Sequence, residues 1–256
     1  MLWLAFAFFL TALLYASVGF GGGSTYSALL ALAGVDFRIL PSLSLTCNIL
    51  VVAGGTIRFA KADVVPWRSA GILVALAAPA AFLGGLTPIG QSAFFLLLGV
   101  SLVLAGVLLL VSPGQEQGPH RPRRAARFVP LCATPLGYLA GLVGIGGGIF
   151  LAPLLHLTRW HNGRAIAATA SLFILINSLF GLLGQLARGG FETLEEAFSL
   201  GWPLMAAVVL GGQFGTVLAL RVLPLQYLRW LTALLTVWVG AKLLWDNPPP
   251  GVAWPS

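Results

Sequence analysis

The stretch that decides the fold is Gly19-Phe20-Gly21-Gly22-Gly23, and a second run, Gly144-Ile145-Gly146-Gly147-Gly148, follows it 125 positions later. Each run comes after an apolar segment that holds a tyrosine, Tyr15 in the first and Tyr138 in the second. Each run also precedes a short apolar segment. Self-similarity over this distance indicates a duplicated half rather than a solenoid, whose repeats are shorter. The sequence therefore predicts a protein built from two related halves.

The composition places the chain in a membrane. Apolar residues make up 58% of the 256 residues, and charged residues make up only 8%. Several uncharged runs reach the roughly 20 residues that a helix needs to cross a bilayer core. These runs are continuous and do not alternate with a period of two, so helices are expected rather than strands. The sequence predicts an all-α polytopic membrane protein whose surroundings are the lipid bilayer.

Charge and cysteine usage exclude several other functions. The formal net charge of +7 comes from basic residues between apolar runs, which is not the aromatic-laced patch of a nucleic-acid-binding protein. Cys47 and Cys132 lack metal-binding or disulfide spacing, and the three histidines are scattered. A membrane enzyme would need a nucleophile beside a base, or a metal cluster, and the sequence indicates neither. We therefore expect no enzyme activity, no metal and no cofactor, and the lack of a Walker motif argues against an internal ATPase.

Ten uncharged segments divide evenly between the halves. They cover approximately residues 2–18, 22–34, 40–57, 69–87 and 91–111, and then 128–143, 147–158, 165–187, 198–220 and 223–241, the last of which carries one charged residue, Arg229. The predicted domains are a first transmembrane repeat at 1–111, a basic linker at 112–127, a second transmembrane repeat at 128–246 and a flexible tail at 247–256. The segments after the glycine runs give only about 16 Å of helix against a core of about 30 Å. Each half is therefore expected to hold five helical elements, one of them short or discontinuous.

The distribution of basic residues favours inverted repeats. If all five elements of each half cross, 11 of the 14 Lys and Arg residues fall on one side, the linker among them, and 3 on the other. If each post-glycine segment instead returned to its own side, the split would be 9 against 5. The positive-inside rule favours the first arrangement. It predicts two repeats of inverted topology, a cytoplasmic linker and both termini outside the cytoplasm.

The glycine runs are the expected ligand site. Glycine lets backbone N–H groups approach a ligand closely, and a helix that begins there presents unsatisfied donors and the positive end of its dipole. Inverted-repeat transporters often bind their substrates at such interruptions near the repeat interface. Ser24 is expected to cap the first short helix, whereas the second begins with Ile149 and Phe150, so the first half-site is the more polar.

The chain resembles the TauE/SafE sulfite exporters, also called the toluene-sulfonate uptake permease family, over nearly its whole length. The family pattern is a twice-repeated G-x-G-G-G, an apolar stretch with proline, and then an Ala-Thr-Ser region. The second copy matches it with Gly144, Gly146, Gly147, Gly148, Pro153, Ala168 and Thr169, with Ala170 before Ser171. The first copy departs from the pattern, with Ala28 where Pro153 would align and Cys47 after Thr46. The resemblance implies transport of small sulfur oxyanions and organosulfonates across the bacterial inner membrane.

The candidate substrate ligands are the glycines and the polar residues that begin the following helices. When the two copies are aligned, Thr46 corresponds to Thr169 and Cys47-Asn48 corresponds to Ala170-Ser171. Asn177 of the second copy falls where Gly54 stands in the first. The candidate set comprises Gly21, Gly22, Gly23, Ser24, Thr46, Cys47, Asn48, Gly146, Gly147, Gly148, Thr169, Ser171 and Asn177. The alternative for the hydroxyls and amides is hydrogen bonding between helices, and the alternative for the glycines is close helix packing. Packing alone is the interpretation of Gly84, Gly85, Gly211, Gly212 and Gly215.

The positions of the acidic residues indicate what drives transport. All seven are expected in loops or tails, so no span contains a carboxylate of the kind that ion-coupled carriers use. An anion that leaves a negative cytoplasm gains about 2.3 kcal/mol per charge for each 100 mV of potential. The predicted function is potential-driven anion export by alternating access, with the two halves rocking about the site. An anion channel and a non-transporting subunit of a complex are alternatives, and the exact substrate, the direction, the ion coupling and the oligomeric state stay open.

Overall fold

The computed structural model describes residues 2–111, 124–221 and 225–248, and every regular element in these ranges is a helix. Most of the predicted linker and tail lies outside the described residues. The helices are α1 (Leu2–Val18), α2 (Gly23–Leu32), α3 (Leu40–Lys61), α4 (Trp67–Leu86), α5 (Gln91–Val111), η1 (Arg124–Phe128), α6 (Val129–Val143), α7 (Gly148–Leu157), α8 (Gly163–Arg221) and α9 (Leu225–Asp246). The all-helical prediction is confirmed, and the helix after each glycine run is short, as expected, with 10 residues in each of α2 and α7.

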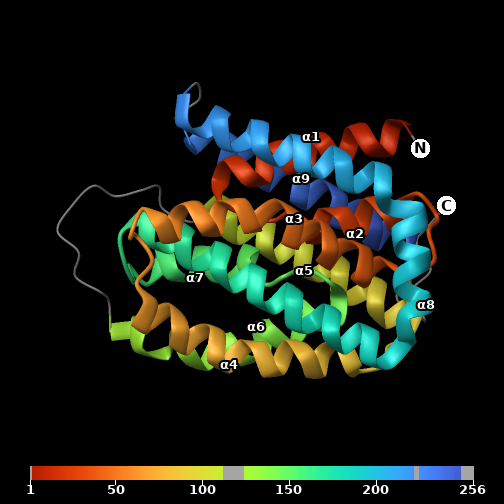
Figure 1. Cartoon of the computed structure of the whole chain (residues 1–256), viewed down its shortest axis with the longest axis horizontal. Helices are drawn as coiled ribbons and strands as arrows, with labels where there is room; N and C mark the ends of the chain where they lie inside the picture. The colour runs from red at the N-terminus through yellow and green to blue at the C-terminus, as the bar shows by residue number, and fades with distance from the viewer. Residues whose placement is uncertain (1, 112–123, 222–224, 249–256) are drawn as a thin grey trace.

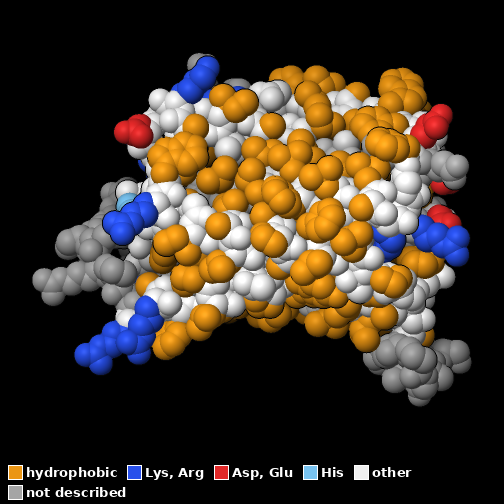
Figure 2. All heavy atoms as spheres, turned by 60° about the horizontal axis from the view of Figure 1, so that its bottom comes forward, with side chains coloured by type: hydrophobic (Ala, Val, Ile, Leu, Met, Phe, Trp, Pro, Cys, Tyr) orange, Lys and Arg blue, Asp and Glu red, His pale blue; other side chains and the backbone are white. Residues whose placement is uncertain are grey.

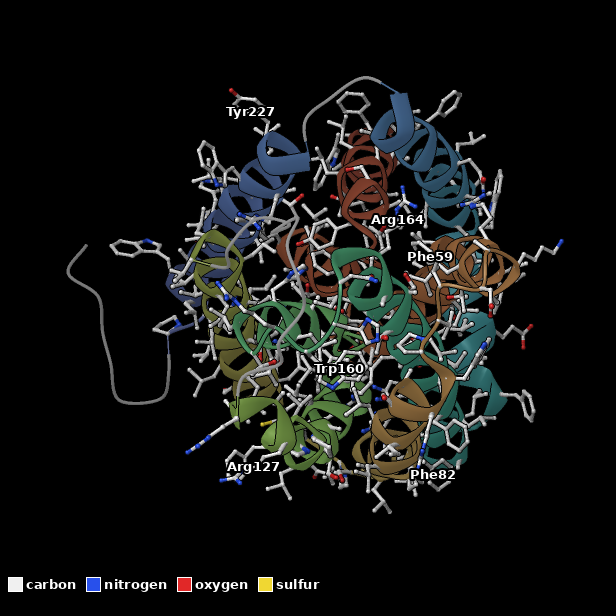
Figure 3. The ribbon with its side chains drawn as sticks, turned by 90° about the vertical axis from the view of Figure 1, so that its left-hand side faces the viewer. Phe59, Phe82, Arg127, Trp160, Arg164 and Tyr227 are labelled. Atoms are coloured by element: carbon white, nitrogen blue, oxygen red, sulfur yellow. The ribbon has the colours of Figure 1, made fainter. Side chains whose placement is uncertain are left out.

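Most of the helices run along one direction (Figure 1). α1 begins and α9 ends at the right-hand end of this view, whereas α5 ends and η1 begins at the left-hand end. The α3–α4 connection packs against the start of α8 at the left-hand end, through Val65, Ala70 and Ala168. Seen from that end, η1 and the α7–α8 connection contribute Arg127, Trp160 and Arg164 (Figure 3). The glycine runs lie between the two ends and separate α1 from α2 and α6 from α7.

α8 is two helices joined at Gly190, and this corrects one expectation. Gly190 has φ 72° and ψ −179°, a backbone conformation that glycine adopts without steric cost. The chain therefore turns without a loop, and the acidic segment that was expected to be a loop forms the first turns of a helix instead. Glu195 and Glu196 lie there with exposed side chains. Acidic residues near a helix N-terminus interact favourably with the helix dipole.

Glycines allow the helices to touch along their backbones. A Cβ atom on Gly84 would collide with the carbonyl of Tyr138 in α6, and one on Gly141 would collide with the carbonyl of Ala81 in α4. Comparable contacts join Gly85 to α8, Gly211 and Gly215 to α1, and Gly106 to α9. Close backbone approach of this kind is how membrane helices gain packing energy where a hydrophobic driving force is lacking. The predicted packing role of Gly84, Gly85, Gly211 and Gly215 is therefore confirmed, and these contacts join helices before the linker to helices after it.

The outer surface is suited to lipid. Five helices among the described residues are long and apolar enough to cross a membrane: Leu40–Lys61, Trp67–Leu86, Gln91–Val111, Arg124–Val143 and Gly163–Phe191. Hydrophobic side chains cover the middle of the face in Figure 2, and the charged side chains lie toward its two ends. The exposed apolar residues include Phe6, Ile72, Leu83, Leu104 and Leu183. An apolar belt between charged ends is the surface expected of a multi-pass membrane protein.

Candidate functional site

The first glycine loop is built on two left-handed residues. Gly19 has φ 87° and Gly22 has φ 82°, which only glycine adopts readily. α2 begins at Gly23, and Gly22 is its N-cap residue, with no side-chain cap. The expectation that Ser24 caps this helix is therefore wrong, because the helix begins before Ser24 and makes it an interior residue. Ser24 is nevertheless buried, with 2% of its surface exposed.

The second loop repeats this geometry with different side chains. Gly144, Gly146 and Gly147 have φ values of 81°, 69° and 77°, and α7 begins at Gly148 with Gly147 as its N-cap residue. After the glycine, α2 continues with Ser24, Thr25, Tyr26 and Ser27, whereas α7 continues with Ile149, Phe150, Leu151 and Ala152. All eight of these side chains are buried. The first glycine and the N-cap glycine are thus left-handed in both loops, whereas Gly146 is left-handed and Gly21 is not. The polarity of the following helices differs.

One face of α3 contacts both loops. Pro41, Ser44 and Asn48 are three and four residues apart, so they lie on the same face of the helix. A Cβ atom on Gly144 would meet Pro41, and the Ser44 hydroxyl contacts two carbonyl oxygens, those of Gly23 and, at 2.9 Å, Gly144. Ser44 therefore links the start of α2 to the start of the second loop.

The first turns of α8 make the reciprocal contacts. The Ser171 hydroxyl donates to the carbonyl oxygen of Gly19 at 3.1 Å, and a Cβ atom on Gly19 would lie 3.4 Å from the Cβ atom of Ala167. Ser44 in α3 thus contacts the first glycine of the second loop, and Ser171 in α8 contacts the first glycine of the first loop. Each loop is held by the long helix that follows the other.

Asn48 lies where the two loops meet. Its Oδ1 atom accepts a hydrogen bond from the backbone N–H of Gly23 at 2.8 Å. Its Nδ2 atom lies 2.8 Å from the position that a Cβ atom on Gly146 would take, and it is buried without a hydrogen-bond partner among the described residues. The amide therefore uses its acceptor on the first loop and directs an unused donor toward the second.

Two residues of α8 complete this meeting point. The same Cβ position on Gly146 lies 2.9 Å from Ile174 Cγ2 and 3.2 Å from Ser178 Oγ. Ile174 and Ser178 are one helical turn apart on one face of α8. Ser178 is fully buried, and its hydroxyl has no partner among the described residues. Buried polar groups are normally hydrogen-bonded, so these two groups are candidates for contact with a ligand.

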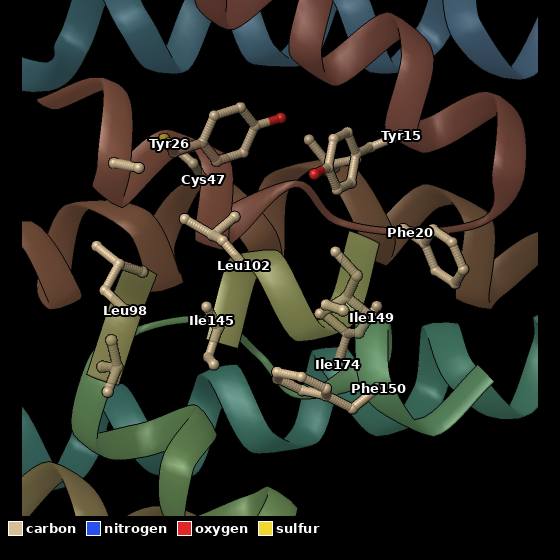
Figure 4. Close-up of a cluster of buried hydrophobic side chains, with 14 of the residues drawn as sticks. Tyr15, Phe20, Tyr26, Cys47, Leu98, Leu102, Ile145, Ile149, Phe150 and Ile174 are labelled. Atoms are coloured by element: carbon tan, nitrogen blue, oxygen red, sulfur yellow. The ribbon is translucent and has the colours of Figure 1, made fainter. Parts of the chain in front are cut away.

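The other polar candidates are distributed more widely. Asn177 is fully buried, and both its Oδ1 and Nδ2 atoms lack partners in the part of the chain that the structure describes. Thr169 Oγ1 is also buried and unpaired. Thr46 donates to the carbonyl oxygen of Ser42 at 2.8 Å, a bond within its own helix. Cys47 is a free, fully buried thiol beside Tyr26 (Figure 4). The structure therefore brings Asn48 to both loops, and it shows no contact of Thr46 with either loop.

Three residues at the meeting point were missed by the sequence reasoning, namely Ser44, Ile174 and Ser178. Ser44 could have been found, because it precedes Asn48 by one helical turn and so shares its face. Ile174 and Ser178 were harder to find, because the alignment of the copies paired Asn48 with Ser171. In the structure Ile174 covers Gly148 much as Asn48 covers Gly23, so the isoleucine is the spatial counterpart of the asparagine.

Apolar side chains line the other side of the second loop. Ile149, Phe150 and Ile174 lie beside one another, and Ile145 extends from the loop toward α5 (Figure 4). Tyr15 and Tyr26 lie on the side of the first loop, where the Tyr15 hydroxyl is hydrogen-bonded to Thr25 Oγ1 at 2.6 Å and to Thr236 Oγ1 at 2.5 Å. The region around the loops is therefore polar toward α2 and apolar toward α7.

These features together define a class of protein. Long apolar helices with an exposed apolar belt enclose two interrupted helices, whose glycine loops meet at buried polar side chains. This is the construction of a multi-pass helical membrane transporter. Residues 4–243 match the family model "Sulfite exporter TauE/SafE". The chain belongs to the TauE/SafE family, which is a family of transporters and not of enzymes.

Curated relatives agree with this assignment. The chain is 33% identical to the "Probable membrane transporter protein y4hK" of Sinorhizobium fredii over 94% of its own length and 97% of the relative. It is 23% identical to the "Probable membrane transporter protein MJ0441" of Methanocaldococcus jannaschii over 79% of the chain and 82% of the relative. A similar identity of 23% relates it to MamO of Magnetospirillum gryphiswaldense, over 88% of the chain and 41% of that protein. No solved structure matches the chain.

Proposed function

We propose that this protein is a secondary transporter that exports small sulfur-containing anions, such as sulfite or organosulfonates, by alternating access. The family supports the substrate class, since its members are described as sulfite exporters. The binding region is the meeting point of the two glycine loops, where backbone N–H groups and the starts of α2 and α7 favour negative charge. The candidate ligands are Asn48, Asn177 and Ser178 together with the glycines, and Thr169, Ser171, Ser24 and Cys47 lie around them.

The observation that carries this proposal is the Asn48 side chain. Asn48 is fully buried, its acceptor is used by Gly23, and its Nδ2 donor has no partner among the described residues. Leaving a buried donor unpaired costs about 1–3 kcal/mol, so a ligand that accepts this hydrogen bond recovers that free energy. An oxyanion fits this role because it offers several acceptor oxygens and carries the charge that the helix starts favour.

The proposed architecture is a pair of inverted repeats, 1–111 and 128–246, joined by a cytoplasmic linker at 112–127 and followed by a tail at 247–256. The reciprocal contacts of Ser44 with Gly144 and of Ser171 with Gly19 support a two-fold relation between the halves. Arg58, Lys61 and Arg164 flank the connections at the end where α5 leaves and η1 begins. The positive-inside rule assigns that end to the cytoplasm of a bacterial cell, with both termini on the far side of the inner membrane.

The rearrangement that alternates access is proposed to run between groups of helices rather than between intact halves. Glycine contacts tie α4 to α6 and α8, and α5 to α9, so each half is clamped to the other along these seams. Packed cores are stiff and switch between discrete arrangements instead of deforming. Movement is therefore expected at the loops themselves and at Gly190, where α8 turns. Export would be driven by the membrane potential, because each negative charge that leaves the cytoplasm releases about 2.3 kcal/mol for each 100 mV.

The test is flux of radiolabelled sulfite in proteoliposomes, with the potential clamped and no pH gradient. The intact protein should give saturable flux, which a channel would not show. Asn48→Leu keeps the side-chain size and removes both the unpaired donor and the acceptor of the Gly23 N–H, so flux at low substrate concentration should fall about 10- to 150-fold or more, at least as expected for a hydrogen bond to a charged group. The matched control is Ile174→Leu, an apolar exchange at the facing position that removes no hydrogen-bonding group, so its flux should fall much less. If Asn48→Leu gave the same flux as the intact protein, Asn48 would not be a substrate ligand.

A further inference from the structure

The donors at the meeting point of the glycine loops are all neutral. Asn48 Nδ2 and Ser178 Oγ are fully buried and have no hydrogen-bond partner among the residues that the structure describes. They lie within 3.2 Å of the Cβ position on Gly146 that Ile174 Cγ2 also approaches at 2.9 Å. Uncharged N–H and O–H groups can stabilise one negative charge by donating hydrogen bonds to it. The isoleucine stands where a further donor could have been. A ligand held here therefore meets polar groups on one side and a hydrocarbon surface on the other.

The arginines of the two helices lie far from this point. Arg58 follows Asn48 by ten residues in α3, and Arg188 follows Ser178 by ten residues in α8. Arg164 precedes Ile174 by ten residues, and Arg221 lies at the far end of α8. Ten residues of helix span about 15 Å, so each guanidinium begins well away from the donors. Arg58 donates to Gln213 Oε1 at 3.4 Å, and Arg188 donates to the carbonyl oxygen of Thr87 at 2.8 Å and to Gln185 Oε1 at 2.6 Å. Arg58 therefore interacts near the end of α3, and Arg188 interacts beside the turn at Gly190, instead of at the meeting point.

We infer that the site selects a singly charged anion and rejects a doubly charged anion of the same shape. The cost of taking an ion out of water rises with the square of its charge, so a dianion pays about four times the penalty of a monoanion. Two neutral donors beside a hydrocarbon side chain offset less of this larger penalty than a paired cation would. The inference rests on the proposed transport function and deepens it, because it assigns the transported species as hydrogensulfite or a sulfonate monoanion whose apolar part would face Ile174.

The test compares two competitors of the same shape. Methanesulfonate is a monoanion at any physiological pH, whereas methylphosphonate passes from monoanion to dianion near neutral pH. Each is added against radiolabelled sulfonate flux in proteoliposomes with the potential clamped, over a range of pH values that spans the second ionisation of methylphosphonate. Competition by methylphosphonate should weaken by about tenfold for each pH unit above that ionisation, following the monoanion fraction, whereas competition by methanesulfonate should not change.

Methanesulfonate also controls for titration of the protein itself. The titratable groups on α1, α2, α3, α6, α7, α8 and α9 are Tyr15, Tyr26, Cys47, Arg58, Lys61, Cys132, Tyr138, His156, Arg164, Arg188, Glu192, Glu195, Glu196, Arg221, Tyr227, Arg229, Lys242 and Asp246. Any effect of these groups on transport would appear with both competitors. Constant or stronger competition by the phosphonate dianion would overturn the inference and leave the transport function standing. Loss of all saturable sulfonate and sulfite flux would overturn both, and a pH dependence shared by the two competitors would assign selectivity to the protein groups and contradict the inference.

Discussion

The two glycine loops have similar backbones and different chemistry. In both, left-handed glycines lead into a helix of 10 residues, and a residue of a long helix covers the first helical glycine. In the first loop that residue is Asn48, whose Oδ1 atom accepts the Gly23 N–H, and in the second it is Ile174, whose side chain covers Gly148. The shared backbone depends on glycine, whereas the covering residue decides what each loop can bind.

This difference gives the two loops different roles in binding. At the first loop, Asn48 Oδ1 accepts the Gly23 N–H at the start of α2, and Asn48 Nδ2 has no partner among the described residues. This loop therefore offers a polar group to a ligand. The second loop is closed by hydrocarbon, with Ile149 and Phe150 beside Ile174 (Figure 4). A site with donors on both sides would hold an anion tightly and release it slowly. A site with one polar and one apolar side binds more weakly, which suits a transporter that must release its substrate on the far side.

The strongest loss of flux is expected when a methyl group is added to the first loop, in Gly23→Ala. In Gly23→Ala the new methyl would collide with the Asn48 amide, breaking its bond to residue 23 and moving the free donor. We expect flux at low substrate concentration to fall about 10- to 150-fold, as for the loss of a hydrogen bond to a charged group. Proteoliposome flux of radiolabelled sulfite measures this.

Gly148→Ala is the matched control for that substitution. Its methyl would press on the Ile174 side chain, which is apolar and offers the ligand no donor. Overpacking of this kind costs about 1–3 kcal/mol of stability, so the melting temperature should fall, and the flux of the folded protein should fall less than in Gly23→Ala because no side-chain donor is moved. If both substitutions reduced flux equally, the two loops would contribute equally and the proposed specialisation would be wrong.

An exchange of the two covering residues gives a smaller effect. Asn48→Ile alone should lose flux as Asn48→Leu does. Adding Ile174→Asn to it places the amide over Gly148 and restores one donor at the meeting point, so flux should return to within about tenfold of the intact protein, roughly half of the free energy lost. Such a rescue would show that the loops are interchangeable supports. Absence of rescue in a folded double variant would mean that other residues of the first half, such as those of α2, are also required.

The sequence predicted more of the scaffold than of the site. Apolar runs between polar breaks located α1, α4, α5, α6 and α7 closely, because span length is imposed by the bilayer. Asn48 stood out as an amide within an apolar run. Gly190 was not anticipated as a turn, because only its φ and ψ angles show that the chain reverses there without a loop.

Ser171 shows why the rest of the site could not be predicted. It was expected to bind substrate, and in the structure it donates to the carbonyl oxygen of Gly19. The alignment of the copies paired it with Asn48, whereas the packing of α8 on the loops gives that place to Ile174. Ser171 and Ile174 are three residues apart in α8. Neighbouring helix positions are about 100° apart around the axis, so the residue that faces the loops depends on how the helix packs. Register between helices is set by packing, which the spacing of residues along one chain does not record.

The smallest expected effect separates the two serines that link the halves. Ser44 contacts the carbonyl oxygens of Gly23 and Gly144, whereas Ser171 contacts that of Gly19 alone, at 3.1 Å. The Ser44 hydroxyl has one proton to donate, and its contact with Gly23 is shorter than the contact of Ser171 with Gly19. Hydrogen bonds between membrane helices average about 0.6 kcal/mol and reach about 1.7 kcal/mol, so Ser44→Ala should cost about 1 kcal/mol and Ser171→Ala about half of that. A cost of 1 kcal/mol lowers the melting temperature of a chain of this size by about 2–4 °C, which thermal unfolding in detergent resolves. A larger loss in Ser171→Ala would mean that the first loop depends on α8 more than the second depends on α3, which reverses the asymmetry argued from Asn48.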